Sequence, residues 1–90
     1  MHHPYSFYHN QAVRLHTQWC ENLKGLKTVT EPEAKQLWLD DLLYLARQAA
    51  QLTATGQLNA HDTELLRHIT DRTIAEHVAI LKAAYVVPLF

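Results

Sequence analysis

Glycine and proline are confined to the borders of three long stretches of helix-forming sequence. The chain has two glycines and three prolines in 90 residues, and each falls at or near a point where the apolar periodicity stops. In chain order these residues are Pro4, Gly25, Pro32, Gly56 and Pro88. Between them Leu, Ala, Gln, Glu, Lys and Arg predominate, and all six are good helix formers. The pattern predicts helices over about 6–24, 31–54 and 60–87.

The helix ends carry local signals of their own. Gly25 is expected to adopt the left-handed conformation just after the first helix, in a Schellman-type ending. Thr30 and Glu33 have the spacing of a capping box at the start of the second helix, and Pro32 fits the first turn there. Asn59 is expected to cap the third helix. The connections are then about five residues long, which makes successive helices antiparallel neighbours.

Apolar residues recur at helical spacing in each stretch and predict the buried faces. The first face consists of Tyr8, Ala12, Leu15, Trp19 and Leu23. The second helix has two adjoining apolar rows, namely Trp38, Leu42, Leu45, Ala49 and Leu52 and then Leu39, Leu43, Ala46 and Ala50. The third face consists of Leu66, Ile69, Thr73, His77, Ile80, Leu81 and Ala84. We therefore expect an all-α antiparallel three-helix bundle, a single domain over residues 1–90, with the second helix packed from two sides.

Charge and cysteine content disfavour several classes of protein. Eight Lys and Arg against nine Asp and Glu give a net charge of −1, far from the positive charge that binding to nucleic acid phosphates requires. The lone Cys20 cannot form an internal disulfide, which favours a reducing compartment. No apolar run reaches the roughly 18 to 20 residues that span a bilayer, and the first residues lack a basic stretch before an apolar core. We expect a cytoplasmic protein without membrane contact.

One polar stripe of the first helix contains possible metal ligands. His9, His16 and Cys20 share this stripe, and His16 and Cys20 are one turn apart, a spacing that can chelate a metal. One side of a straight helix cannot surround a tetrahedral ion, so a solvated flank is favoured and no metal or cofactor is expected. His16 and Cys20 also resemble a base and a nucleophile, but nothing supplies an orienting third residue or an oxyanion hole. The sequence therefore does not predict an enzyme or a small-molecule substrate.

The third stretch has further histidines that require an interpretation. His61, Glu64 and His68 share a face, and an exposed surface with an ordinary Glu-to-His contact is favoured there over a metal or pH-sensitive pair. His77 lies in the middle of the apolar face. We expect it to be a core or interface histidine, hydrogen-bonded to a hydroxyl such as that of Thr73 or capped from a neighbouring helix. A pH switch at His77 is the alternative, because protonating a buried imidazole costs desolvation energy.

More apolar residues are present than a three-helix monomer would bury. Leu37 and Tyr44, seven residues apart, lie on the otherwise polar back of the second helix. The candidate interface consists of Leu37, Leu43, Tyr44, Tyr85, Val86, Leu89 and Phe90. Apolar patches of this kind mark contacts between proteins. We expect a larger helical assembly, a homodimer whose second and third helices form much of the interface, serving as an adaptor, chaperone-like or regulatory accessory protein.

Two alternatives from other classes stay open at this point. A helical transcriptional regulator could pair to create a DNA-facing surface from Arg14, Lys24 and Lys27. A metal or pH sensor could use the histidine stripes. The identity of a protein partner does not follow from the residues.

Overall fold

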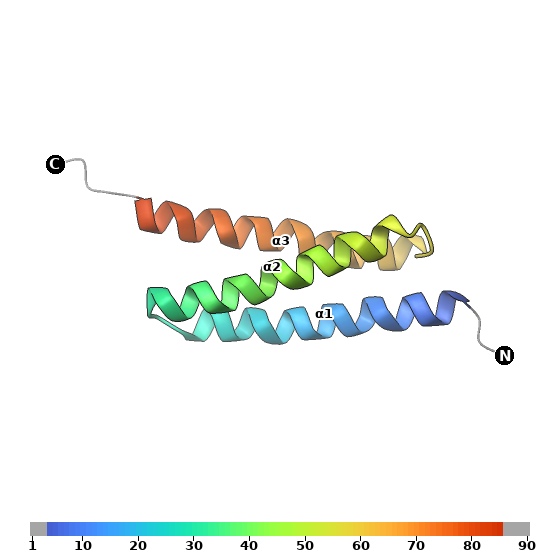
Figure 1. The fold of residues 1–90 in the computed structure, drawn as a ribbon, viewed down its shortest axis with the longest axis horizontal. Helices are drawn as coiled ribbons and strands as arrows, with labels where there is room; N and C mark the ends of the chain where they lie inside the picture. Colours follow the sequence, from blue (N-terminus) through green and yellow to red (C-terminus); the bar gives the residue numbers. More distant parts are fainter. Residues whose placement is uncertain (1–3, 86–90) are drawn as a thin grey trace.

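Three antiparallel helices of similar length make up the described part of the chain. The computed structural model describes residues 4–85, with α1 at Pro4–Thr28, α2 at Pro32–Ala54 and α3 at Ala60–Tyr85 (Figure 1). The predicted all-α three-helix bundle is confirmed, and residues 4–85 contain no strand. The last two residues of the expected third helix lie outside the described residues. Within the described range, no helix has the length and apolar character needed to cross a bilayer.

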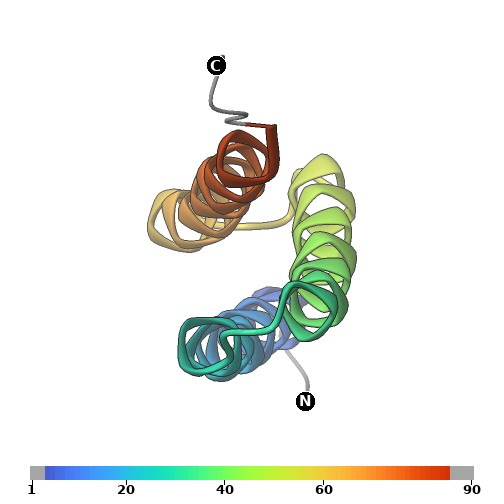
Figure 2. The same cartoon turned by 90° about the vertical axis from the view of Figure 1, so that its left-hand side faces the viewer.

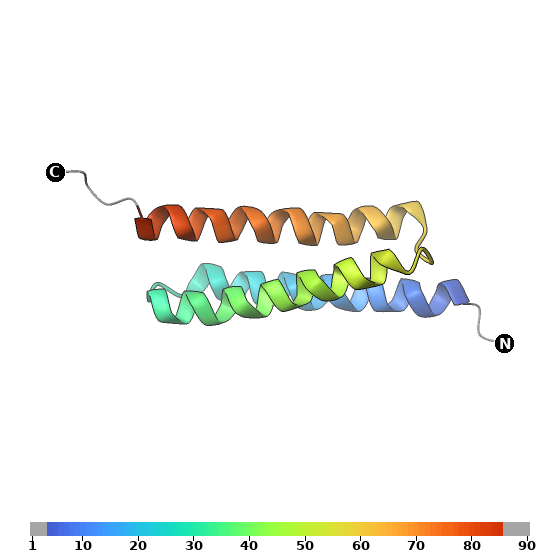
Figure 3. The same cartoon turned by 45° about the horizontal axis from the view of Figure 1, so that its top comes forward.

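Helix α2 is the central element of the bundle. The end view of Figure 2 shows α2 beside both other helices, and α1 and α3 pack against each other less extensively than either packs against α2. This confirms that α2 is packed from two sides. At the end of the bundle where α1 ends and α2 begins, α3 lies apart from the other two helices (Figures 1 and 3). The C-terminal part of α3 is therefore less covered than its beginning.

The core runs along the side of α2 that faces the other helices. It consists of Ala12, Trp19, Leu26, Leu42, Leu45, Ala49, Leu66 and Ile69. Leu42, Leu45 and Ala49 belong to the predicted apolar row of α2 and are all buried. Each fully buried leucine contributes about 1.5 to 3 kcal/mol relative to an exposed one. The spacing of apolar residues thus identified the inward face of the central helix.

Gly25 does not end α1, which corrects the expected Schellman-type ending. The helix continues through Gly25 to Thr28, and Gly56 is the one residue of the described chain with a positive φ, at 70°. A Cβ atom at Gly25 would lie 2.6 Å from Cη2 and Cζ2 of the Trp38 ring. Gly25 is therefore a packing glycine, because only a residue without a side chain leaves room for the indole of α2 against α1.

The start of α2 also differs from expectation, whereas the start of α3 agrees with it. The N-cap of α2 is Glu31, in an extended conformation and without a side-chain cap hydrogen bond. Thr30 thus lies one residue too early to cap the helix, and the capping box with Glu33 does not form. Pro32 occupies the first turn as predicted. At α3 the Asn59 cap is confirmed, since its Oδ1 accepts a hydrogen bond from the N–H of residue 62 at 2.7 Å.

Candidate interaction surface

The outward side of α2 carries the candidate interface residues that the structure describes. Leu37 is 69% exposed and Tyr44 is 61% exposed, and Leu43 is exposed to a smaller degree. The other candidates have side chains outside the described part of the chain: Tyr85, Val86, Leu89 and Phe90. The interface therefore stays a prediction, with three of its members placed on the surface of one helix.

Two charged residues lie among these apolar ones. At about 100° per residue, Leu37 and Tyr44 differ by roughly 20° around α2, and Leu43 lies about 100° from Tyr44. Asp40 and Arg47 fall between them, and both are exposed. We call the five residues Leu37, Asp40, Leu43, Tyr44 and Arg47 the outer face of α2. Asp40 accepts a hydrogen bond from Gln36 at 2.9 Å, but neither charge forms an ion pair with a described side chain.

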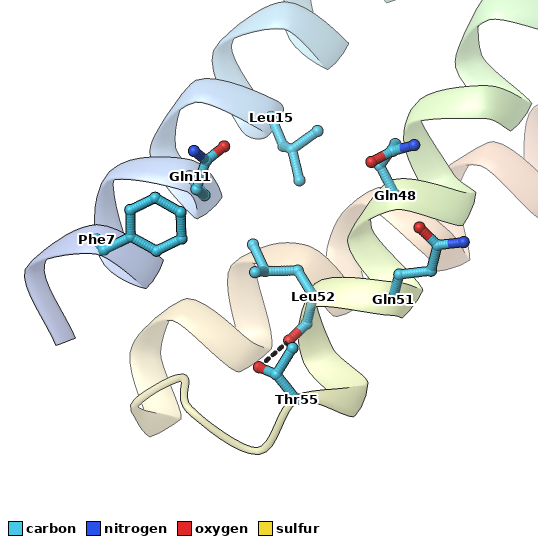
Figure 4. A pocket seen from close by; sticks show the side chains of 7 residues that line it. All are labelled: Phe7, Gln11, Leu15, Gln48, Gln51, Leu52 and Thr55. Atoms are coloured by element: carbon cyan, nitrogen blue, oxygen red, sulfur yellow. Dashed lines mark hydrogen bonds between the residues drawn. The ribbon is translucent and has the colours of Figure 1, made fainter. Parts of the chain in front are cut away.

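A shallow groove of about 290 Å³ lies between α1 and α2, next to the outer face (Figure 4). It is lined by Phe7, Gln11, Leu15, Gln48, Gln51, Leu52 and Thr55. The Thr55 hydroxyl donates to the Leu52 carbonyl at 2.7 Å, which is the dashed contact in Figure 4. The lining has no titratable side chain, so it offers neither an acid nor a base for catalysis.

A second groove, of about 410 Å³, lies between α2 and α3. Its lining is formed by Ala50, Thr53, Ala54, Thr63, Arg67, Thr70 and Asp71. Further along α3, on the side of the helix that carries Arg67 and Asp71, three apolar residues are exposed, namely Ile74, Val78 and Leu81. Leu81 was expected in the core and is 41% exposed, because α3 lies apart from the other helices at this end. The apolar periodicity of α3 continues past the point where a neighbour covers it, and for that reason the sequence placed Leu81 incorrectly.

Helices α1 and α3 are joined by buried polar contacts. The Trp19 indole Nε1 donates to the Thr73 hydroxyl at 2.9 Å, and both groups are buried. The imidazole of His68 meets the Trp19 ring edge-on, with 5.6 Å between centroids. The imidazole of His16 is tilted relative to the same ring, with 6.0 Å between centroids. Burial, and to a lesser extent the nearby His68, lowers the pKa of His16. Protonation of His16 is therefore disfavoured in the folded state.

Glu76 is a buried carboxylate that the sequence did not single out. It is 8% exposed and accepts hydrogen bonds from Lys27 of α1 at 2.9 Å and Arg72 of α3 at 3.3 Å. Two cations compensate the desolvation of this charge. The contact also engages Lys27, one of the three basic residues of the DNA-binding alternative. Lys27, Arg14 and Lys24 are all exposed. Arg72 lies four residues before Glu76, a local signal, but Lys27 is distant in the sequence.

A second buried carboxylate ties the start of α1 to the start of α3. Asp62 is 1% exposed, and its Oδ2 lies 2.8 Å from Nδ1 of His9. Its Oδ1 has no hydrogen-bond partner in the described structure. Asp62 lies in the first turn of α3, where the helix dipole stabilises a carboxylate. His9, placed by the sequence on a stripe of possible metal ligands, is the partner of this carboxylate.

His77 does not form the hydrogen bond that was expected with Thr73. The Thr73 hydroxyl accepts from Trp19 instead. His77 is half-buried, and its Nδ1 is buried with no hydrogen-bond partner in the described structure. The hydroxyl one turn before His77 thus connects α3 to the indole of α1.

The two histidine stripes lie on different helices, the first on α1 and the second on α3. Cys20 Sγ lies 3.8 Å from the ring nitrogens of His16. His61, Glu64 and His68 lie on an exposed surface as expected, but Glu64 pairs with Arg67 at 3.2 Å instead of with a histidine. Among the residues that the structure describes, no three His, Cys, Asp or Glu side chains are grouped so that they could hold a metal ion.

No model of a known protein family, no curated protein and no solved structure matches the chain. The candidate function consequently rests on the chemistry of the described surface. Polar groups of α1 such as Trp19 and Lys27 meet partners on α3, whereas the large apolar side chains of the outer face of α2 project into solvent. The outer face is therefore the strongest candidate site.

Proposed function

We propose that the protein is a non-enzymatic protein-interaction module that acts as a homodimer through the outer face of α2. One observation carries the proposal: Leu37 and Tyr44 are 69% and 61% exposed, although both are large and mainly apolar and lie one heptad apart on the same stripe. Full burial of a side chain of this size is worth about 1.5 to 3 kcal/mol. A partner that covers both side chains would gain that free energy, whereas the folding of a single chain leaves them exposed.

The composition of the outer face supports the same proposal. Asp40 and Arg47 lie between the apolar residues and are exposed, so the face combines apolar anchors with charged neighbours. Anchors of this kind supply most of the affinity in protein interfaces, and surrounding polar groups supply orientation. An adaptor, chaperone-like or regulatory accessory role in the cytoplasm fits such a module.

The test is the absolute mass in solution by light scattering behind size exclusion, over about a hundredfold range of concentration. We expect the mass of two chains for the natural sequence. Replacing both anchors, Leu37→Gln with Tyr44→Gln, should raise the dissociation constant by at least about tenfold, since it removes about 1.4 kcal/mol or more of apolar burial. Circular dichroism checks that the helices of the variant persist.

Ile74→Gln is the matched control, because Ile74 is an exposed apolar residue on α3, away from the outer face. It should leave the dissociation constant unchanged within about twofold. A monomer at every concentration of the natural sequence would overturn the homodimer. A dimer that Ile74→Gln disrupts and the double variant does not would move the interface to α3.

A further inference from the structure

Two opposite charges of the outer face of α2 lie at equal distances from its centre. Asp40 and Arg47 carry opposite charges, and the midpoint between them falls between Leu43 and Tyr44. Both are exposed, and neither forms an ion pair with a described side chain. A segment with this arrangement is complementary to a second copy of itself that runs in the opposite direction.

We infer that α2 packs antiparallel against α2 of a second copy, about a two-fold axis that passes between Leu43 and Tyr44. The inference rests on the proposed homodimer and specifies its register. Around this axis Asp40 of each copy lies at the height of Arg47 of the other, so the dimer contains this ion pair twice. Leu43 of one copy lies beside Tyr44 of the other. The contact is isologous and closes at two chains.

A parallel arrangement is disfavoured by the same charges. In register, two parallel α2 helices would place Asp40 against Asp40 and Arg47 against Arg47, and like charges across an interface cost several kcal/mol. A parallel pair shifted by seven residues would match one Asp40 with one Arg47. It would leave the other Asp40 and the other Arg47 without a partner, so the assembly would not be complete at two chains. Antiparallel packing satisfies both charges of both copies.

The exposed apolar residues of α3 lack such an arrangement. The charges nearest to Ile74 on that face are Arg67 and Asp71, and Arg67 pairs with Glu64 at 3.2 Å and approaches Asp71 at 3.9 Å. These charges already compensate one another within one chain. Compared with this face of α3, the outer face of α2 has opposite charges without an ion-pair partner in the described structure. Helix α2 is 23 residues long and offers a contact on the order of 35 Å in length.

Charge reversal tests the register directly. Asp40→Arg alone, or Arg47→Asp alone, turns both ion pairs into like-charge contacts, and each should raise the dimer dissociation constant about tenfold or more. The double exchange, Asp40→Arg with Arg47→Asp, restores opposite charges and should return the constant to within about threefold of the natural value. An equimolar mixture of the two single variants should form a mixed dimer more tightly than either variant pairs with itself.

Glu21→Arg is the control, because it makes the same change of charge at an exposed residue of α1. It should leave the dissociation constant unchanged, and added salt should shrink the effect of the Asp40 and Arg47 variants. If the natural sequence dimerises but the double exchange does not rescue the single variants, the proposed register is wrong and the homodimer stands. A natural sequence that stays monomeric over the whole concentration range overturns both.

Discussion

Helices α1 and α2 use their amphipathic surfaces in different ways. Phe7 of α1 is 58% exposed, but other groups of this helix meet specific partners inside the chain, as Trp19 does with Thr73 and Lys27 with Glu76. The outer face of α2 instead leaves Leu37 and Tyr44 largely exposed. The difference suggests a division of roles, in which contacts of α1 fix the monomer and the outer face of α2 serves association. Substitutions in α1 should then change the free energy of unfolding, and substitutions on the outer face should change the dissociation constant.

The largest effect is expected at Trp19, which is buried and hydrogen-bonded. Trp19→Ala removes the indole from the core and should lower the free energy of unfolding by about 3 to 5 kcal/mol. Trp19→Phe keeps most of the ring and loses the donor to Thr73, so it should cost about 1 to 3 kcal/mol. Urea titration measures both, at protein concentrations where light scattering finds monomer.

Tyr44→Ala is the matched variant on α2, since it also removes an aromatic ring. Because Tyr44 is 61% exposed, the monomer should lose no more than about 0.5 kcal/mol. A loss for Tyr44→Ala as large as that for Trp19→Ala would contradict the proposed division between the two helices.

A smaller effect with an unusual sign is expected at Gly25. Glycine-to-alanine changes inside a helix normally stabilise it by about 1 kcal/mol. Here the new Cβ would lie 2.6 Å from the Trp38 ring, so Gly25→Ala should destabilise the monomer by about 1 to 3 kcal/mol through overpacking. The same change should cost less in a Trp38→Leu background, where the ring is absent. A Gly25→Ala protein more stable than the natural one would show that Trp38 moves aside freely.

Local sequence signals were sufficient to predict the three helices and the inward face of α2. Asn59 caps α3 because a short amide side chain just before a helix can reach a free backbone N–H, and this needs no knowledge of the rest of the fold. The row of Leu42, Leu45 and Ala49 is buried because its spacing matches one side of a helix. Exposure of Leu37 and Tyr44 agrees with their place on the polar back of α2, while their role in an interface remains a proposal.

Contacts between distant parts of the chain could not be predicted in this way. Trp19 and Thr73 are 54 residues apart, and Lys27 and Glu76 are 49 apart. Periodicity identifies which side of each helix is buried, but it does not say which residue lies opposite which. Gly25 shows the same limit. A glycine near the end of a helix looks the same in the sequence whether it forms a terminal turn or leaves room for a packing contact. Only the position of the Trp38 ring distinguishes the two.

The smallest effect is expected in the pH dependence of stability, through His16 on α1. Burial, and secondarily His68 of α3, lowers the pKa of His16 below its ordinary value of 6.5. As the pH falls below about 6.5, the unfolded chain therefore takes up a proton at this position before the folded chain does. The contribution of His16 to stability is complete above that pH and declines as the pH falls towards the lowered pKa of the folded state.

His16→Gln should accordingly flatten the loss of unfolding free energy between about pH 7 and pH 5, measured by urea titration at each pH. The titratable groups near the imidazole are Cys20 of the same helix, at 3.8 Å, and His68 of α3. His61→Gln is the control, because His61 is exposed, and it should keep the natural slope. An unchanged slope for His16→Gln would remove this role. Because His16 lies on α1 and not on the outer face of α2, the variant should leave the pH dependence of dimer dissociation as it is in the natural protein.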